Sequence, residues 1–83
     1  MNPDHKADLP ETLWFEEDDP RRDGLEAALY AAELTELRAL WQRTRAAAAA
    51  ARRRGDMVQV ILLVRGSKTI QRIADERGAV FVN

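Results

Sequence analysis

The chain of 83 residues and 9.4 kDa has room for one small domain. Hydrophobic residues make up 46% and charged residues 33%, which excludes a disordered chain, and no apolar run approaches the roughly 18 residues of a membrane-spanning helix. No secretory leader begins the sequence, so we expect a cytoplasmic protein. The absence of cysteine excludes disulfides, thiolate metal sites and a cysteine nucleophile. His5 is the single histidine, and one histidine cannot form a catalytic triad or a multi-histidine metal site. We therefore expect neither enzymatic activity nor a cofactor.

The charges are segregated along the chain. Residues 1–37 hold 11 acidic and 3 basic residues, a net charge of −8, whereas residues 38–83 hold 10 basic and 3 acidic residues, a net charge of +7. This asymmetry indicates that one half meets the other, within a chain or between copies, or that one half steers a charged partner. Arginine outnumbers lysine 11 to 2 and alanine occurs 14 times, which is typical of a GC-rich bacterial or phage coding sequence.

Residues 1–22, here called the lead, are predicted to be acidic and irregular, because three prolines interrupt any long element. Trp14 and Phe15 lie in an apolar cluster followed by a run of acids, a composition typical of short segments that dock into a partner's hydrophobic groove. In the alternative interpretation, both aromatic side chains pack over the protein's own small core. The candidate partner-binding residues are Leu13, Trp14, Phe15, Glu16 and Glu17.

A long helix is expected over residues 23–54. Asp23 and Glu26 have the spacing of a capping box, and Gly55 is a natural left-handed terminator after three arginines. Apolar residues recur at heptad spacing, in the order Ala27, Tyr30, Leu34, Leu37, Trp41, Thr44, Ala48 and Ala51. Leu25, Leu29 and Leu40 widen this stripe to one side, and a wide stripe can pack on a sheet and on a second helix at once. The candidate self-interface residues on it are Leu34, Leu37 and Trp41.

The remaining sequence predicts a small βαβ unit. Residues 57–64 are apolar and rich in β-branched side chains, as in a strand buried on both faces. Ser67 is a good cap for a helix over residues 68–77, and residues 79–82 predict a second, parallel strand. Residues 23–83 are therefore expected to form a single small α/β domain of αβαβ order. Its apolar residues are few for a domain with about 60 ordered residues, so we expect self-association or burial against a partner.

A basic cluster supports a second kind of contact. At the expected start of the later helix, free amides and the side chains of Ser67, Lys68 and Thr69 could hold an anion, although a plain helix cap is the simpler interpretation. Residues 67–80 also resemble the recognition helix and following strand of winged-helix regulators. That resemblance implies that Lys68, Thr69, Gln71 and Arg72 face a nucleic-acid groove. The candidate anion or nucleic-acid contacts are Arg52, Arg53, Arg54, Ser67, Lys68, Thr69 and Arg72.

Two functional hypotheses follow from these features. In the first, the chain is a non-enzymatic regulatory or adaptor protein, of the kind that phages and plasmids carry, which acts by protein–protein contact as a homodimer. In the second, it is a small DNA- or RNA-binding regulator that uses its basic half, and the acidic lead shields that surface until displaced. Neither hypothesis involves a membrane.

Overall fold

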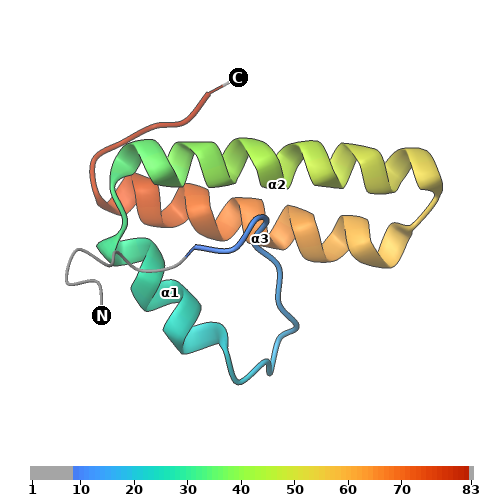
Figure 1. Ribbon diagram of the computed structural model, residues 1–83, viewed down its shortest axis with the longest axis horizontal. Helices are drawn as coiled ribbons and strands as arrows, with labels where there is room; N and C mark the ends of the chain where they lie inside the picture. Colours follow the sequence, from blue (N-terminus) through green and yellow to red (C-terminus); the bar gives the residue numbers. More distant parts are fainter. Residues whose placement is uncertain (1–8, 83) are drawn as a thin grey trace, which may run out of the picture.

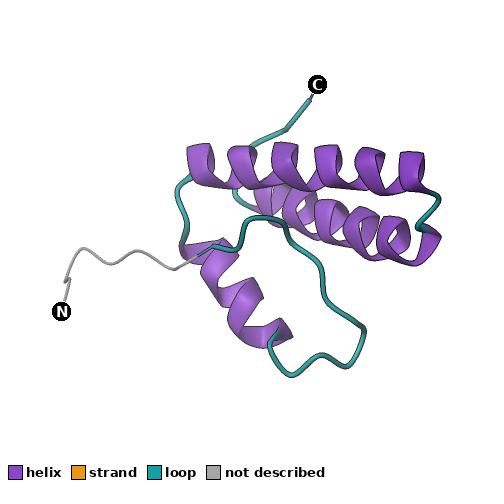
Figure 2. Ribbon diagram, turned by 45° about the vertical axis from the view of Figure 1, so that its right-hand side comes forward, coloured by secondary structure: helices purple, strands orange, loops and turns teal. Residues whose placement is uncertain are grey.

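The computed structural model describes residues 9–82 and contains three helices, α1 (Arg22–Ala31), α2 (Leu34–Arg54) and α3 (Met57–Glu76) (Figure 1). α2 and α3 run antiparallel as a hairpin, and α1 lies at the end of the hairpin opposite its turn. Figure 2 shows only helices and loops in this described part of the chain. The expected αβαβ order is therefore wrong, and the domain is all-helical over the residues described. Residues 9–21 of the lead are irregular, as predicted.

A glycine and a helix cap form the turn between α2 and α3. Gly55 has a φ of 77°, a left-handed conformation that glycine adopts without steric cost, and its N–H donates to the Arg52 carbonyl at 3.0 Å. The Asp56 carboxylate accepts the backbone N–H of Gln59 at 3.2 Å and so caps the first turn of α3. The prediction that Gly55 ends a helix is confirmed. Because the cap follows at once, the chain enters another helix instead of a strand.

Residues 57–64, predicted as a buried strand, form the first part of α3. Val60 and Leu63 are buried and pack in one cluster with α2, whereas Val58 and Ile61 are exposed. Only one side of this apolar segment therefore packs against α2. β-branched residues favour strands weakly, and a short apolar run is compatible with either element. The cap at Asp56 and the packing on α2 decide in favour of the helix.

The later elements also differ from the prediction. Ser67, the expected cap, lies inside α3, where its hydroxyl donates to the Val64 carbonyl at 2.8 Å. The helix expected after it is the second half of one continuous helix. Residues 79–82, expected as a strand, are an irregular tail in which Phe81 packs on Trp41 with ring centroids 5.5 Å apart. The strand that a winged-helix arrangement requires after its recognition helix is therefore absent from the described residues.

The helix expected over residues 23–54 is interrupted between α1 and α2. Ala32 and Glu33 have extended backbone, with ψ values of 156° and 151°. The Glu36 carboxylate accepts the backbone N–H of Glu33 at 3.2 Å, which completes a capping box at the start of α2. The predicted capping box at Asp23 is wrong, because that residue already lies in the first turn of α1.

The hydrophobic core is thick at one end of the hairpin and thin at the other. The larger cluster joins the lead, all three helices and the C-terminal tail, and its buried members are Leu13, Phe15, Leu29, Ala32, Leu37, Leu40, Trp41, Ile70, Ile73, Ala74 and Phe81. The smaller cluster joins α2 and α3 alone, and its buried members are Ala48, Ala51, Val60 and Leu63. The part of the molecule near the turn, residues 46–64, is called the distal hairpin below.

The lead docks on the hairpin partly through its backbone. The Leu13 side chain is fully buried, and its backbone N–H donates to the Thr44 hydroxyl oxygen at 3.0 Å. Its carbonyl lies so close to Gly66 that any Cβ at that position would collide with it. Phe15 is buried in the same core. The interpretation that the lead packs over the protein's own core is confirmed for Phe15.

Candidate functional site

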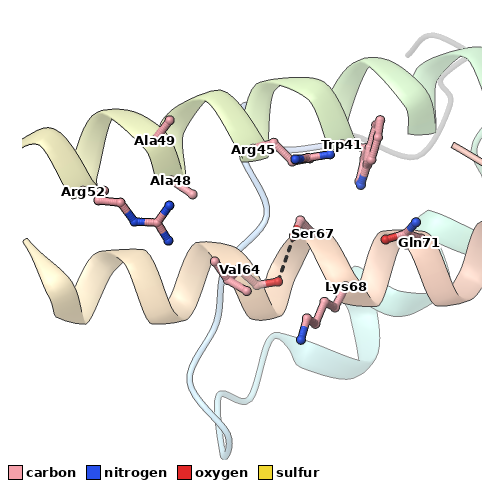
Figure 3. A pocket seen from close by; sticks show the side chains of 9 residues that line it. All are labelled: Trp41, Arg45, Ala48, Ala49, Arg52, Val64, Ser67, Lys68 and Gln71. Carbon is pink, nitrogen blue, oxygen red and sulfur yellow. Dashed lines mark hydrogen bonds between the residues drawn. The ribbon is translucent and has the colours of Figure 1, made fainter. Parts of the chain in front are cut away.

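A groove of about 430 Å³ lies between α2 and α3. Its lining residues, drawn in Figure 3, are Trp41, Arg45, Ala48, Ala49, Arg52, Val64, Ser67, Lys68 and Gln71. Each helix supplies its residues mainly at spacings of three and four, the repeat that keeps side chains on one helix face. The lining combines small apolar side chains with cations, and none of its described residues is acidic.

Arg45 and Trp41 form one part of the groove wall. The Arg45 guanidinium carbon lies 5.0 Å from the centroid of the Trp41 ring, a cation–π distance. Trp41 itself is only 2% exposed and packs on Phe81. The tryptophan therefore positions Arg45 without neutralising its charge, and its own ring is not open for stacking by a ligand.

Among residues 9–82, the cations of the groove have no acidic partners. Arg45, Arg52 and Lys68 are exposed, and none of the carboxylates described lies within ion-pair distance of them. Figure 3 shows Arg52 reaching from α2 into the space between the two helices. Residues 38–74 hold nine basic residues and a single acid, Asp56. The groove therefore lies in a region of positive potential that favours negatively charged ligands.

The structure divides the residues that were predicted to contact an anion or nucleic acid. The three that line the groove are Arg52, Ser67 and Lys68. Arg53 and Arg54 are exposed beside the turn, where Arg54 lies 3.9 Å from Asp56. Because Ser67 and Lys68 lie inside α3, the helix start expected at Ser67 is wrong, both for a plain helix cap and for an anion site built on free amides.

Thr69 and Arg72 are not brought into the groove. Thr69 lines a smaller cavity of about 360 Å³ together with Phe15. The Arg72 guanidinium lies 3.1 Å from Glu76 and 3.7 Å from Glu26, so its charge is balanced at the contact between α3 and α1. Neither residue is available to a ligand bound between α2 and α3.

Sequence reasoning missed the role of Arg45 in the groove, although a signal was present. Arg38, Arg45 and Arg52 recur every seven residues, and this spacing places cations along one face of a helix. Gln71 was assigned only through the winged-helix resemblance. The structure places its side chain in the lining of the groove beside Trp41 and Lys68 (Figure 3).

The predicted partner-binding segment of the lead is split between core and surface. Leu13 and Phe15 are buried and belong to the protein's own core. Trp14 is 37% exposed, and Glu16 and Glu17 are exposed beside it in the chain. Only these last three side chains are accessible to a partner.

The predicted self-interface is similarly divided. Leu37 and Trp41 are buried inside the subunit, which leaves Leu34 as the accessible member of the predicted set. The heptad stripe is buried from Leu37 to Ala51, where it faces the protein's own hairpin, while Tyr30 is exposed.

A second surface lies on the outer side of α3 in the distal hairpin. Met57, Val58 and Ile61 are 54%, 71% and 51% exposed. Ile61 follows Met57 by four residues and Val58 by three, so its side chain is a neighbour of both on the helix surface. Contiguous large apolar side chains on a surface mark interaction sites. These three residues are called the α3 patch below.

A polar cluster fastens α1 to α3. The Tyr30 hydroxyl donates to the Glu76 carboxylate at 2.5 Å, and Arg72 donates to the same carboxylate at 3.1 Å. The hydrogen bond from Tyr30 is the main cause that lowers the pKa of Glu76, and the same bond raises the pKa of Tyr30. Both shifts move the groups away from neutral pH, so the cluster is suited to holding helices together and not to proton transfer.

No group of three or more His, Cys, Asp or Glu residues among those described is placed to hold a metal ion. No described helix combines the length and apolar character needed to cross a membrane. His5 lies outside the described residues. No protein-family model, curated protein or solved structure matches the chain. The groove and the α3 patch are therefore the features on which a functional assignment rests.

Proposed function

We propose that the chain is a cytoplasmic, non-enzymatic regulatory or adaptor protein that acts by protein–protein contact and forms a homodimer. The observation that carries this proposal is the α3 patch, in which Met57, Val58 and Ile61 are more than half exposed. The patch lies where the molecule is only two helices thick. Two helical hairpins that pair through such faces form a four-helix bundle, in which the exposed apolar side chains become buried.

The geometry of α3 allows a second copy to occupy the patch. If two α3 helices cross antiparallel at Ile61, each copy contributes the same three apolar side chains to a closed, two-fold contact. Asp56 lies outside this face, because five residues at about 100° each place it about 140° around the helix from Ile61, and its carboxylate already caps α3. The proposed dimer therefore depends on apolar burial and not on charge pairing.

Sedimentation velocity of the full chain over a range of concentrations tests the proposal. We expect dimers at micromolar concentration and a dissociation constant at least tenfold weaker in the Val58→Glu variant, because a charge would have to be buried on both copies. Val80→Glu is the matched control, since Val80 is also 71% exposed but lies in the C-terminal tail. Circular dichroism confirms that both variants retain their helices. A chain that is monomeric throughout, or equal effects of the two substitutions, would refute the homodimer.

Binding of DNA or RNA is the second candidate, favoured by the excess of bases on residues 38–74. It predicts an affinity for duplex DNA that falls steeply between about 50 and 200 mM salt. Deleting the lead is not a clean test of shielding, because Leu13 and Phe15 would be removed from the core. The full chain is therefore the protein to use in a gel shift, and the absence of a complex at low salt excludes this candidate.

A further inference from the structure

We propose that the groove between α2 and α3 binds an acidic, amphipathic helix of a partner protein. Its apolar side chains would rest on the small residues of the groove, and its carboxylates would pair with Arg45 and Arg52. The inference rests on the proposed function in taking a protein as the ligand. It adds a second surface, distinct from the α3 patch.

Charge complementarity identifies the sign and spacing of the ligand's charges. Arg45 and Arg52 lie two helical turns apart on α2, a rise of about 10.5 Å. Carboxylates at positions i and i+7 of a ligand helix have the same spacing and the same face. Lys68 supplies a third cation from the α3 side. Because these cations have no acidic partners within the described chain, a ligand need not displace an existing ion pair.

The apolar part of the groove explains why the ligand is an amphipathic helix. Ala48, Ala49 and Val64 have short side chains, which leave room for larger aliphatic side chains between the two helices. A ligand helix with acids at i and i+7 presents its i+3 and i+4 residues to this area. Such a helix would cover the distal hairpin, which has only two helices of its own.

The same features favour a protein ligand over a nucleic acid in this groove. Phosphates would pair with Arg45 and Arg52 but would leave the apolar surface of Ala49 and Val64 without a contact. Base stacking is not available either, because the Trp41 ring is 2% exposed.

Fluorescence anisotropy with a labelled peptide tests the inference on the full chain. The probe is an alanine-based helical peptide with Glu-Ala-Ala-Leu-Leu-Ala-Ala-Glu at its centre. Arg52→Gln should weaken binding about tenfold, as expected for the loss of one charge-assisted hydrogen bond to the peptide. Arg53→Gln is its matched control, since it removes the same charge from the adjacent residue outside the groove. It should leave the affinity within about twofold.

A second pair of variants tests the apolar contact without changing any charge. Ala49→Leu fills the groove with a good helix former, and we expect it to abolish peptide binding. Ala46→Leu is the control, because Ala46 is exposed on the same helix and does not line the groove. Circular dichroism establishes that both proteins are folded.

The outcomes separate this inference from the homodimer. Peptide binding that survives Val58→Glu supports a groove independent of the α3 patch. No peptide binding to a chain that still dimerises refutes the groove and leaves the homodimer standing. Equal losses in Arg52→Gln and Arg53→Gln, or unchanged binding in Ala49→Leu, would also refute the groove, because they indicate diffuse electrostatic attraction. A duplex DNA that outcompetes the peptide, with no effect of Ala49→Leu, would assign the cations to nucleic acid.

Discussion

Replacing Gly66 by alanine tests how the lead is held on the hairpin. At an exposed helical position this substitution stabilises a protein by about 1 kcal/mol, because alanine has the higher helix propensity. At Gly66 we expect the opposite sign, since the new Cβ would collide with the Leu13 carbonyl. That carbonyl belongs to the backbone and cannot rotate away like a flexible side chain. The lead must therefore shift or detach.

The size of the effect follows from the contacts that the lead makes. If it detaches, Leu13 and Phe15 leave the core, with a loss of about 2 kcal/mol each. The hydrogen bond from Leu13 to Thr44 contributes about 1 kcal/mol more. The gain in helix propensity offsets about 1 kcal/mol. The net loss is therefore about 4 kcal/mol at most, which is a large part of the 5–15 kcal/mol of a typical domain, and it is smaller if the lead only shifts.

Urea unfolding monitored by circular dichroism measures this change. Gly24→Ala is the matched control, because Gly24 lies in α1 and nothing surrounds the position of its Cβ within 4 Å. We expect this variant to be more stable than the parent by about 1 kcal/mol. A Gly66→Ala protein as stable as the parent, or more stable, would refute the close contact between the lead and α3.

Three further substitutions test other contacts. Thr44→Val leaves the buried Leu13 N–H without its acceptor and should destabilise the fold by about 2 kcal/mol in the same urea assay, whereas Thr44→Ser should retain most of the stability. Hydrogen bonds from Arg21 lower the pKa of Asp19 to about 2. The ionised Asp19 therefore stabilises the fold above the ordinary pKa of an aspartate, and this contribution is lost as the pH falls toward 2. Arg21→Gln should raise the pKa of Asp19 in an NMR titration, and an unchanged pKa would contradict the hydrogen bonds between the two residues. Gly55→Ala should lower the free energy of unfolding by about 1 kcal/mol, because the positive φ strains an alanine. No other atom lies within 4 Å of the position of the new Cβ, so the φ is the only cause. An equally stable variant would show that the turn tolerates a side chain.

Features set by local chemistry could be predicted from the sequence. Gly55 was identified as the end of a helix, because a glycine after a long helical pattern favours the left-handed cap. The apolar stripe from Leu37 to Ala51 was also recognised and is buried, since its spacing repeats over several turns. For the site, the basic residues of the sequence indicate Arg52 and Lys68 as candidate ligand contacts, and both line the groove.

Features set by tertiary contacts could not be predicted in the same way. Residues 57–64 have the composition of a strand, and only packing against α2 selects the helix. The break at Glu33 carries no glycine or proline to mark it. Gly66 looks like the end of an element, but its role depends on Leu13, which lies more than fifty residues earlier in the chain. Arg45 lines the groove because α3 folds back beside α2. Predicting this position of Arg45 requires knowing that residues 57–76 form a helix.

The uneven thickness of the hairpin has a consequence for its dynamics. Near the lead, α2 and α3 pack in a core that also includes residues of the lead, α1 and the C-terminal tail. Toward Gly55, the buried residues of each helix pack only against the other helix. Amide hydrogen exchange should therefore be fastest near the turn and slow progressively toward the opposite end, as the molecule opens locally from its tip. A partner that binds the tip would suppress these openings there first, so the pattern of newly protected amides would locate the binding surface before the partner itself is identified.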